Sequence, residues 1–209
     1  MLALAFLAGL PLGQAVTLID YESSWHLWRG QRAPSKPDYW AWNKPDFDDS
    51  GWETAVSPIF FGEKVKGGTE LTDMKSKYNS FFVRKKFDSP EPEHITSATL
   101  RAKVDDGFVA YINGTEVARY NVTTEKPKYS SKSTKAATEP LRFLNYEIDD
   151  FKSVLKNGDN TLAIIVLNQR RTSPDVMFDA KLSVVSDESD PPMVPAPVAA
   201  RSVRAIVPK

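Results

Sequence analysis

The clearest structural signal in this chain is the stretch VDDGFVAYINGTEVARY, residues 104–120. Two runs rich in aromatic, β-branched and small apolar residues, 108–112 and 116–120, flank the pair Asn113-Gly114. Both central residues of a type I′ turn need a positive φ, and Asn-Gly satisfies this requirement well. The stretch therefore predicts a tight β-hairpin.

Strand-like patterns continue on both sides of this hairpin. Residues 97–104 alternate strictly between apolar and polar, residues 79–87 mix aromatics with charges, and residues 160–167 read as a buried central strand. Residues 176–184 predict a closing strand, whereas the best helix candidate, 148–155, spans two turns at most. Many short strands and little helix predict an all-β fold, an antiparallel β-sandwich of the jelly-roll type.

Composition excludes several classes of function. The 209 residues contain 27 Lys and Arg against 27 Asp and Glu, so the formal net charge is zero and nucleic acid is not an expected partner. Cysteine is absent, which excludes disulfides, thiolate zinc sites and cysteine nucleophiles. Two histidines, His26 and His94, cannot supply a three-histidine metal site.

The two ends of the chain differ from its middle. Residues 2–12 are apolar and are followed by Gly-Gln-Ala, which predicts a signal peptide over 1–15 and a secreted or cell-envelope location, with no membrane span in the mature domain. No Lys or Arg precedes the apolar run, so a buried strand is the alternative. Residues 187–209 are rich in Pro and Ala and predict a linker, with the start of a further domain and a frayed terminus as the two alternatives for its end. The expected domain is 16–186.

A set of motifs recurs in one order along this domain. They are FDDSGW (47–52), SPIFFG (57–62), FFVRKKF (81–87), VDDGFVAYING (104–114), LKNGDN (155–160) and SPD (173–175). In this order they resemble the galactose-binding-domain-like β-sandwich, and in particular the sugar-binding jelly-roll module of family-two glycoside hydrolases, as found in large secreted bacterial proteins. The resemblance implies a non-catalytic accessory domain that is often associated with carbohydrate and sometimes holds a structural calcium ion.

Aromatic residues are the first candidates for carbohydrate binding, because pyranose rings stack on aromatic faces. All five tryptophans fall within residues 25–52. Trp28, Trp40 and Trp52 are expected in the core, whereas Trp25 and Trp42 are expected to be exposed. The full set of expected ligand-binding residues is Trp25, Trp42, Tyr39, Arg119, Asn121 and Asp175.

Other polar residues suggest metal binding or catalysis. Asp46, Asp48, Asp105 and Asp106 offer the hard oxygen ligands that calcium prefers, although their spacing matches no twelve-residue calcium loop. Asp105 and Asp106 also suit a turn between two strands. Glu147 and Asp149 would share one face of a strand, as paired carboxylates do in jelly-roll glucanases, but Phe151 occupies the place of a further carboxylate.

Three functions therefore remain open from sequence. The first is a non-catalytic accessory domain that binds a carbohydrate or polysaccharide, with no certain cofactor and at most structural calcium. The second is a structural module that docks against other domains of a longer chain. The third is a small jelly-roll glycoside hydrolase that uses Glu147.

Overall fold

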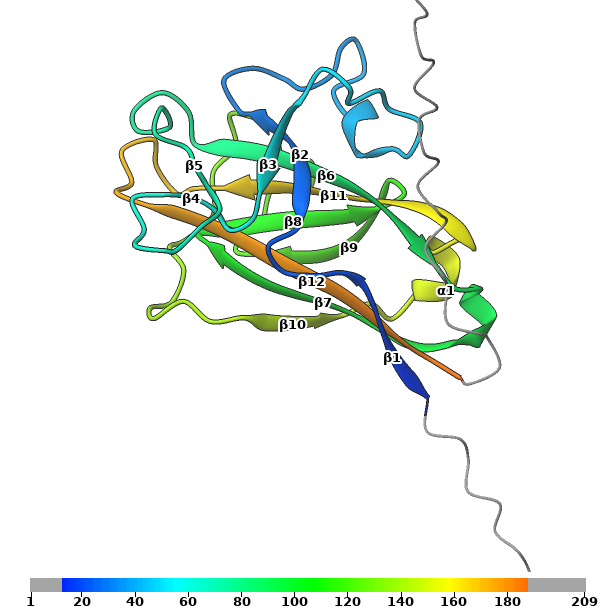
Figure 1. The fold of residues 1–209 in the computed structure, drawn as a ribbon. Coiled ribbons are helices and arrows are strands. Elements are labelled where there is room, and N and C mark those ends of the chain that lie inside the picture. Colours follow the sequence, from blue (N-terminus) through cyan, green and yellow to red (C-terminus); the bar gives the residue numbers. More distant parts are fainter. Residues whose placement is uncertain (1–12, 188–209) are drawn as a thin grey trace, which may run out of the picture.

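The computed structural model describes residues 13–187, which form two stacked β-sheets (Figure 1). The first, called the β12 sheet, contains β10 (Leu144–Glu147), β7 (Ile95–Asp105), β12 (Val176–Ser186), β4 (Ile59–Phe61) and β5 (Thr69–Glu70), with β1 (Gln14–Ile19) beside β12. The second, called the β11 sheet, contains β3 (Glu53–Val56), β2 (Ser24–Arg29), β6 (Ser80–Ser89), β11 (Gly158–Leu167), β8 (Gly107–Ile112) and β9 (Thr115–Tyr120). All pairings are antiparallel except the short β4–β5 pair, which confirms the predicted all-β sandwich.

The hairpin and the central strand are confirmed. Strands β8 and β9 pair across a turn in which Asn113 has φ 52° and Gly114 has φ 89°. Strand β11 lies between β6 and β8, and its residues from Asn160 to Leu167 are all buried. A strand buried on both faces reads as a continuous apolar run, which is why this segment lacks alternation.

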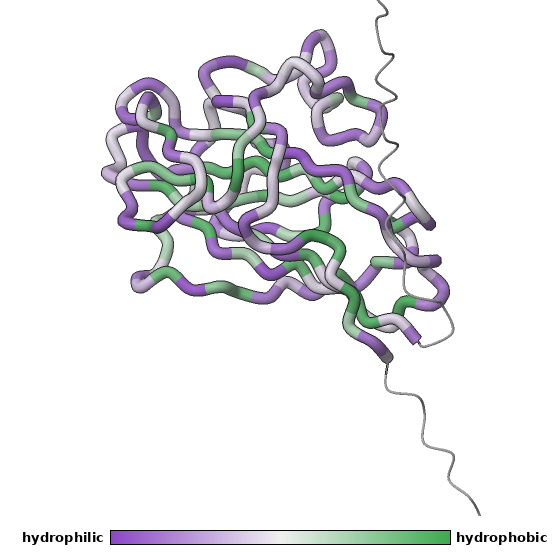
Figure 2. The backbone as a smooth tube through the Cα atoms, in the orientation of Figure 1, coloured by the Kyte–Doolittle hydropathy of each residue, from purple (hydrophilic) through white to green (hydrophobic). Residues whose placement is uncertain are grey.

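The hydrophobic core has two layers. One layer fills the space between the sheets, and the second lies on the outer face of the β11 sheet. The loop between β2 and β3, drawn in light blue in Figure 1, covers this outer face and includes the short 3-10 turn Ala41–Asn43. Figure 2 shows hydrophobic segments concentrated in the strands and hydrophilic segments in the surrounding loops. The β11 sheet is therefore buried on both faces.

The expected exposure of Trp25 and Trp42 is wrong, because each is only 1% exposed. Trp25 points into the sandwich from β2 and meets the Phe178 ring of β12 edge-on at 5.4 Å. Trp42 packs on the outer face of the β11 sheet, 4.8 Å from the Phe82 ring. Neither ring face is available for stacking on a sugar.

The three tryptophans assigned to the core all pack in the outer layer of the β11 sheet. Trp52 is buried, whereas Trp28 and Trp40 are half-buried and pack at the margin of that layer. The core assignment is therefore confirmed for Trp52 and holds only in part for the other two.

A buried arginine holds the covering loop in place. The Arg84 side chain, on β6, is fully buried, and its Nε donates to Asp49 Oδ2 at 2.6 Å. Its Nη1 donates to the carbonyl oxygens of Trp42 and Lys44. His26 Nδ1 lies 2.9 Å from the other oxygen of Asp49. Arg84 thus holds the loop on the sheet through an ion pair with Asp49 and hydrogen bonds to backbone carbonyls of the loop.

The predicted helix is shorter than expected. The helix α1 covers only Phe151–Val154, because Ile148 still donates its N–H to the Ala98 carbonyl of β7 and extends the sheet pairing. Strand β1 begins at Gln14, inside the expected signal peptide 1–15. The rest of the expected signal peptide, residues 1–12, and nearly all of the expected linker, residues 188–209, lie outside the described residues. Among residues 13–187, no helix is long and apolar enough to cross a membrane.

Candidate functional site

Three carboxylates meet where three strands of the β12 sheet begin or end. The neighbouring strands β7, β12 and β4 are antiparallel, so the end of β7, the start of β12 and the end of β4 lie at the same end of the sheet. This brings together Asp105, Asp175 and Glu63, whose carboxylate oxygens all lie within 4.8 Å of one another. We call these three residues the acidic cluster.

Close backbone contacts fix the positions of two of these residues. Gly62 has φ +73°, and a Cβ atom at this position would lie 2.0 Å from the Pro174 carbonyl oxygen. Only glycine permits this approach, which places Glu63 beside Asp175. The Asn168 side chain donates to the Asp175 carbonyl oxygen at 2.6 Å, so the start of β12 is held from both sides.

Asp105 and Asp106 are adjacent in sequence but have different surroundings. The two carboxylate oxygens of Asp106 accept the backbone N–H groups of Ala137 and Gln169, at 2.9 and 2.7 Å. Asp105 is 4% exposed, and its carboxyl group shares hydrogen bonds with those of Asp106 and Asp175. Asp106 is therefore a structural residue, although its carboxylate binds two distant segments and not its own turn, whereas Asp105 faces other carboxylates.

The cluster lies in an environment that disfavours negative charge. Burial, together with the adjacent Asp106 carboxylate, raises the pKa of Asp105 to about 8. Burial also raises the pKa of Asp175 and that of Glu63, and in both cases the negative charge of Glu139 adds to the effect. These groups therefore retain protons at a higher pH than free carboxylates do.

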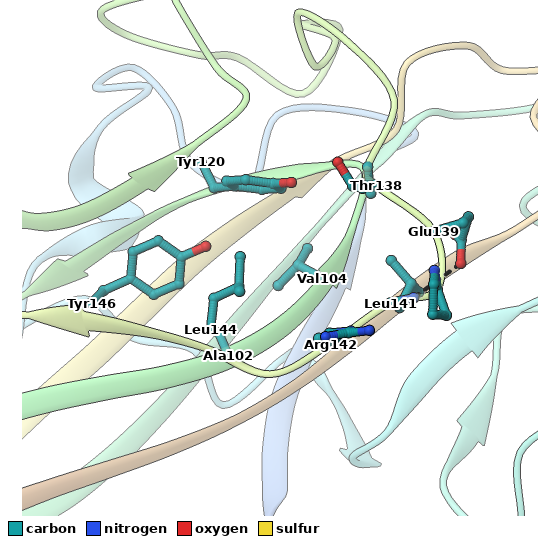
Figure 3. A pocket seen from close by; sticks show the side chains of 11 residues that line it. Ala102, Val104, Tyr120, Thr138, Glu139, Leu141, Arg142, Leu144 and Tyr146 are labelled. Carbon is teal, nitrogen blue, oxygen red and sulfur yellow. Dashed lines mark hydrogen bonds between the residues drawn. The ribbon is translucent and has the colours of Figure 1, made fainter.

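A cleft opens beside the cluster, between the edge strands β9 and β10. Its volume is about 370 Å³, and Figure 3 shows Tyr120 and Tyr146 on one side and the residues of the 137–142 loop on the other. We call it the edge cleft; it is lined by Ala102, Val104, Tyr120, Leu144, Tyr146 and residues 137–142. Leu144 is 43% exposed although its strand partner, Ala102, is a core residue. The sandwich is thus incompletely closed along this edge.

The edge cleft combines aromatic rings with polar groups. The Tyr146 ring meets the Phe108 ring edge-on at 5.1 Å, and burial raises the pKa of Tyr146 to about 12, so its hydroxyl stays protonated at neutral pH. Arg142 is exposed at the rim, and Glu139 accepts the Leu141 N–H. Since Asp106 accepts the Ala137 N–H, one wall of the cleft is joined to the residue that follows Asp105 of the acidic cluster.

The predicted polar ligand residues lie in different places. Of these, only Asp175 belongs to the acidic cluster. Arg119 forms a bidentate pair with Glu116, at 2.7 Å for both contacts. Its remaining N–H groups bind backbone carbonyls of residues 122–125, so it closes its own loop.

The other predicted residues do not belong to the acidic cluster. Asn121 donates to the Asp106 carbonyl at 2.9 Å and supports the turn beside the cluster. Tyr39 is 48% exposed and lies beside a small hollow on the outer face of the β11 sheet. Asp46 and Asp48 are exposed and, among the described residues, belong to no group of three or more possible metal ligands. Glu147 accepts a hydrogen bond from Thr99 at the surface.

Sequence reasoning missed Glu63, Tyr120, Arg142 and Tyr146 as site residues. Glu63 follows the quoted motif SPIFFG directly, and Tyr146 precedes the Glu147 considered for catalysis, but neither has a local signal of function. Their proximity to other site residues comes from the strand order.

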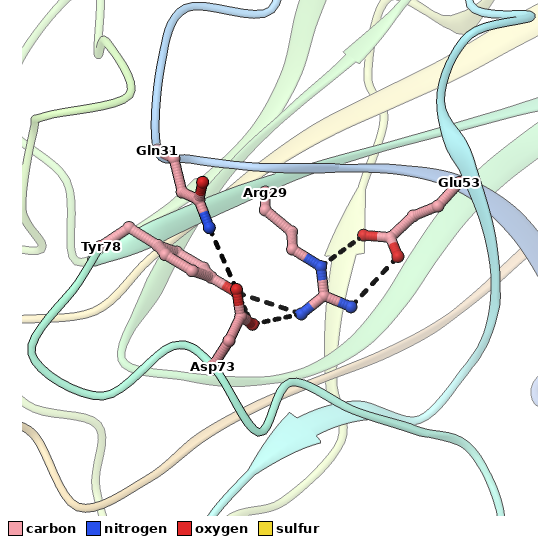
Figure 4. Close-up of polar contacts among 5 residues, drawn as sticks. All are labelled: Arg29, Gln31, Glu53, Asp73 and Tyr78. Atoms are coloured by element: carbon pink, nitrogen blue, oxygen red, sulfur yellow. Dashed lines mark hydrogen bonds and ion pairs between the residues drawn. The ribbon is translucent and has the colours of Figure 1, made fainter.

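A second group of polar residues, around Arg29, has its hydrogen-bond and ion-pair partners within the protein. Figure 4 shows Arg29 between Glu53 and Asp73. Arg29 donates twice to Glu53, at 2.6 and 3.1 Å, and Tyr78 and Gln31 both donate to Asp73. Since every charged group there has a partner, we interpret this network as structural.

Comparisons with known proteins identify the fold. No protein-family model and no curated protein matches the chain. Among solved structures, a Bacteroides uniformis β-glucuronidase matches 83% of this chain at 18% identity with a TM-score of 0.53, over 18% of its own length. A β-glucuronidase from an uncultured Clostridium sp. matches 88% at 15% identity with a TM-score of 0.51, over 31% of its length. The chain thus spans less than a third of these enzymes, and the comparisons confirm the galactose-binding-domain-like β-sandwich fold that the sequence resemblance implies.

Proposed function

We propose that this chain is a non-catalytic accessory domain of a secreted bacterial protein and that it binds carbohydrate in the edge cleft. The observation that carries the proposal is the composition of the cleft, in which Tyr120 and Tyr146 flank an apolar floor and Arg142 and Thr138 form a polar rim. Sugar sites commonly combine an aromatic surface with a few polar groups that fix orientation.

A non-catalytic role agrees with the arrangement of carboxylates. Glu147 lies on the exposed surface of β10 and is bound to Thr99, and its expected partner Asp149 is exposed beyond the end of that strand. A glycosidase needs two carboxyl groups facing one sugar from a common cleft. The similar solved enzymes are also much longer than the matched region, so fold similarity does not assign their activity to this chain.

The test is affinity electrophoresis of the full chain through neutral and uronic-acid-containing polysaccharides. Arg142→Ala and Tyr120→Ala should abolish retardation by the glycan that retards the wild type. The matched control is Arg171→Ala, because Arg171 is exposed and lies outside the cleft. Retardation that both cleft variants retain would refute this site, and a folded wild type that no glycan retards would refute carbohydrate binding.

A docking module is the second candidate, and the exposed Leu144 favours it. An apolar residue whose strand partner lies in the core, yet which is 43% exposed, is a natural contact for another domain. A wild-type chain that is folded but bound by no glycan would favour this candidate over the first.

A further inference from the structure

We propose that Asn157 is a site of non-enzymatic modification, where the side-chain amide is lost through a succinimide ring and replaced by aspartate or isoaspartate. The chain contains two Asn-Gly pairs, Asn157-Gly158 and Asn113-Gly114, which are alike in sequence. The fold gives them different surroundings, and we assign the reaction to the first pair alone. The proposal does not depend on carbohydrate binding.

The reaction needs only two neighbouring residues and water. The backbone nitrogen of Gly158 attacks Cγ of Asn157 and forms a five-membered ring, while the Gly158 amide proton and the Asn157 amino group leave together as ammonia. Water then opens the ring at one of its two carbonyl carbons. Breaking the new N–Cγ bond gives aspartate, and breaking the original peptide bond gives isoaspartate. Glycine favours the attack because it has no Cβ atom to obstruct it.

The surroundings of Asn157 leave its side chain free to react. Asn157 is exposed, and among residues 13–187 its side-chain amide has no hydrogen-bond partner. It lies between α1, which ends at Val154, and β11, which begins at Gly158. Gly158 has φ +75°, and no described residue other than its chain neighbours lies within 4 Å of the place of a Cβ atom. The Asn157 amide therefore has room to turn toward the Gly158 nitrogen.

The second pair has the same residues but a fixed side chain. Asn113 Nδ2 donates to the Val154 carbonyl at 2.8 Å and to Asn160 Oδ1 at 2.7 Å. Its Oδ1 accepts the Thr161 N–H at 3.0 Å. These bonds direct the amide toward α1 and β11 and not toward the Gly114 nitrogen. Attack at Asn113 therefore requires a local opening of the structure, which makes this pair an internal reference.

The two products should affect the fold differently. The Asn160 side chain accepts the Lys156 N–H at 2.9 Å and donates to the carbonyls of Lys156 and Gly158, both at 2.7 Å. These bonds hold the turn on both sides of Asn157, and none of them involves its side chain. Aspartate leaves the backbone unchanged, whereas isoaspartate inserts Cβ into the main chain between the bonded peptide groups. We therefore expect isoaspartate to disrupt the Asn160 contacts and aspartate to leave them intact.

The experiment incubates the purified full chain in mildly alkaline buffer, which favours attack by the amide nitrogen. Both Asn-Gly peptides are then followed by mass spectrometry after digestion at acidic pH. We expect Asn157 to react at least about ten-fold faster than Asn113, because Asn113 must first break its three side-chain hydrogen bonds. In guanidinium chloride the two rates should become similar, since the fold and not the sequence separates them.

Two variants complete the test. Asn157→Gln should remove the reaction at this position and leave the rate at Asn113 unchanged. Asn157→Asp reproduces the aspartate product and should unfold at the midpoint of the unmodified chain, whereas the isoaspartate fraction, purified after incubation, should unfold at a lower temperature.

Two results would overturn the proposal. One is a folded chain in which Asn113 reacts as fast as Asn157. The other is a folded chain in which Asn157 stays intact while the same pair reacts in guanidinium chloride, because the turn would then prevent the attack. An isoaspartate fraction as stable as the unmodified chain would overturn the expected effect on the Asn160 contacts. None of these readouts depends on a glycan, so this proposal and carbohydrate binding can fail separately.

Discussion

Replacing Arg84 by methionine should destabilise the whole sandwich, because Arg84 joins the covering loop to the β11 sheet. The side chain is fully buried and pairs with Asp49 at 2.6 Å. Methionine keeps much of the apolar volume but leaves Asp49 with His26 as its remaining side-chain partner, and it leaves the carbonyls of Trp42 and Lys44 without this donor. Removing one member of a buried ion pair costs about 3–5 kcal/mol, so we expect a loss of this size in the free energy of unfolding.

Urea unfolding followed by tryptophan fluorescence measures this loss, since Trp42 is part of the covering loop and packs against Phe82 of the β11 sheet. The second variant is Asp49→Asn, which retains a hydrogen-bond acceptor for Arg84, and the double variant completes a thermodynamic cycle. The double variant should be less destabilised than the sum of the two single variants, because each single change leaves its partner without a counter-charge. A loss below about 1 kcal/mol in Arg84→Met, or strict additivity of the two changes, would refute the reasoning.

Three further predictions concern the site. The unfolding midpoint should fall as pH rises from 4 to 8, because burial raises the pKa of Asp105 to about 8 in the folded state against an ordinary 3.8, so the folded chain binds more protons in that window; a slope unchanged in Asp105→Asn would contradict this. Gly62→Ala should cost at least about 2 kcal/mol in urea unfolding, given the positive φ and the 2.0 Å approach to Pro174, and an alanine variant as stable as the wild type would show that this contact is relaxed. Glu147→Gln should change stability by less than about 0.5 kcal/mol, because the residue is exposed; any glycosidase activity should also survive it, and loss of activity would revive the hydrolase alternative.

Local patterns predicted the strands well because they report local geometry. The Asn113-Gly114 turn needs only two residues with positive φ, and the continuous apolar run 160–167 needs only burial on both faces. The same logic fails for Trp25. Its strand, SWHLWR, places tryptophan on both faces, so alternation alone cannot tell which tryptophan points inward.

The candidate site was only partly predictable because it depends on strand order. Asp105 and Asp175 each stand beside a strand end and were recognised separately, for different roles. Their meeting with Glu63 requires β12 to lie between β7 and β4, and no local pattern encodes that order. Trp42 was misjudged for a similar reason, because its burial depends on a long loop that folds back over the β11 sheet.

The use of the tryptophans in packing also explains where a ligand can bind. Trp25 belongs to the layer between the sheets, and Trp42 and Trp52 belong to the layer outside the β11 sheet, so both faces of that sheet are occupied. Partly exposed aromatic surface is instead available at the unclosed edge, where the half-buried Tyr120 and Tyr146 face the 137–142 loop. Asp106 connects this loop to the turn that carries Asp105. We therefore expect a ligand at the unclosed edge and not on either face of the β11 sheet.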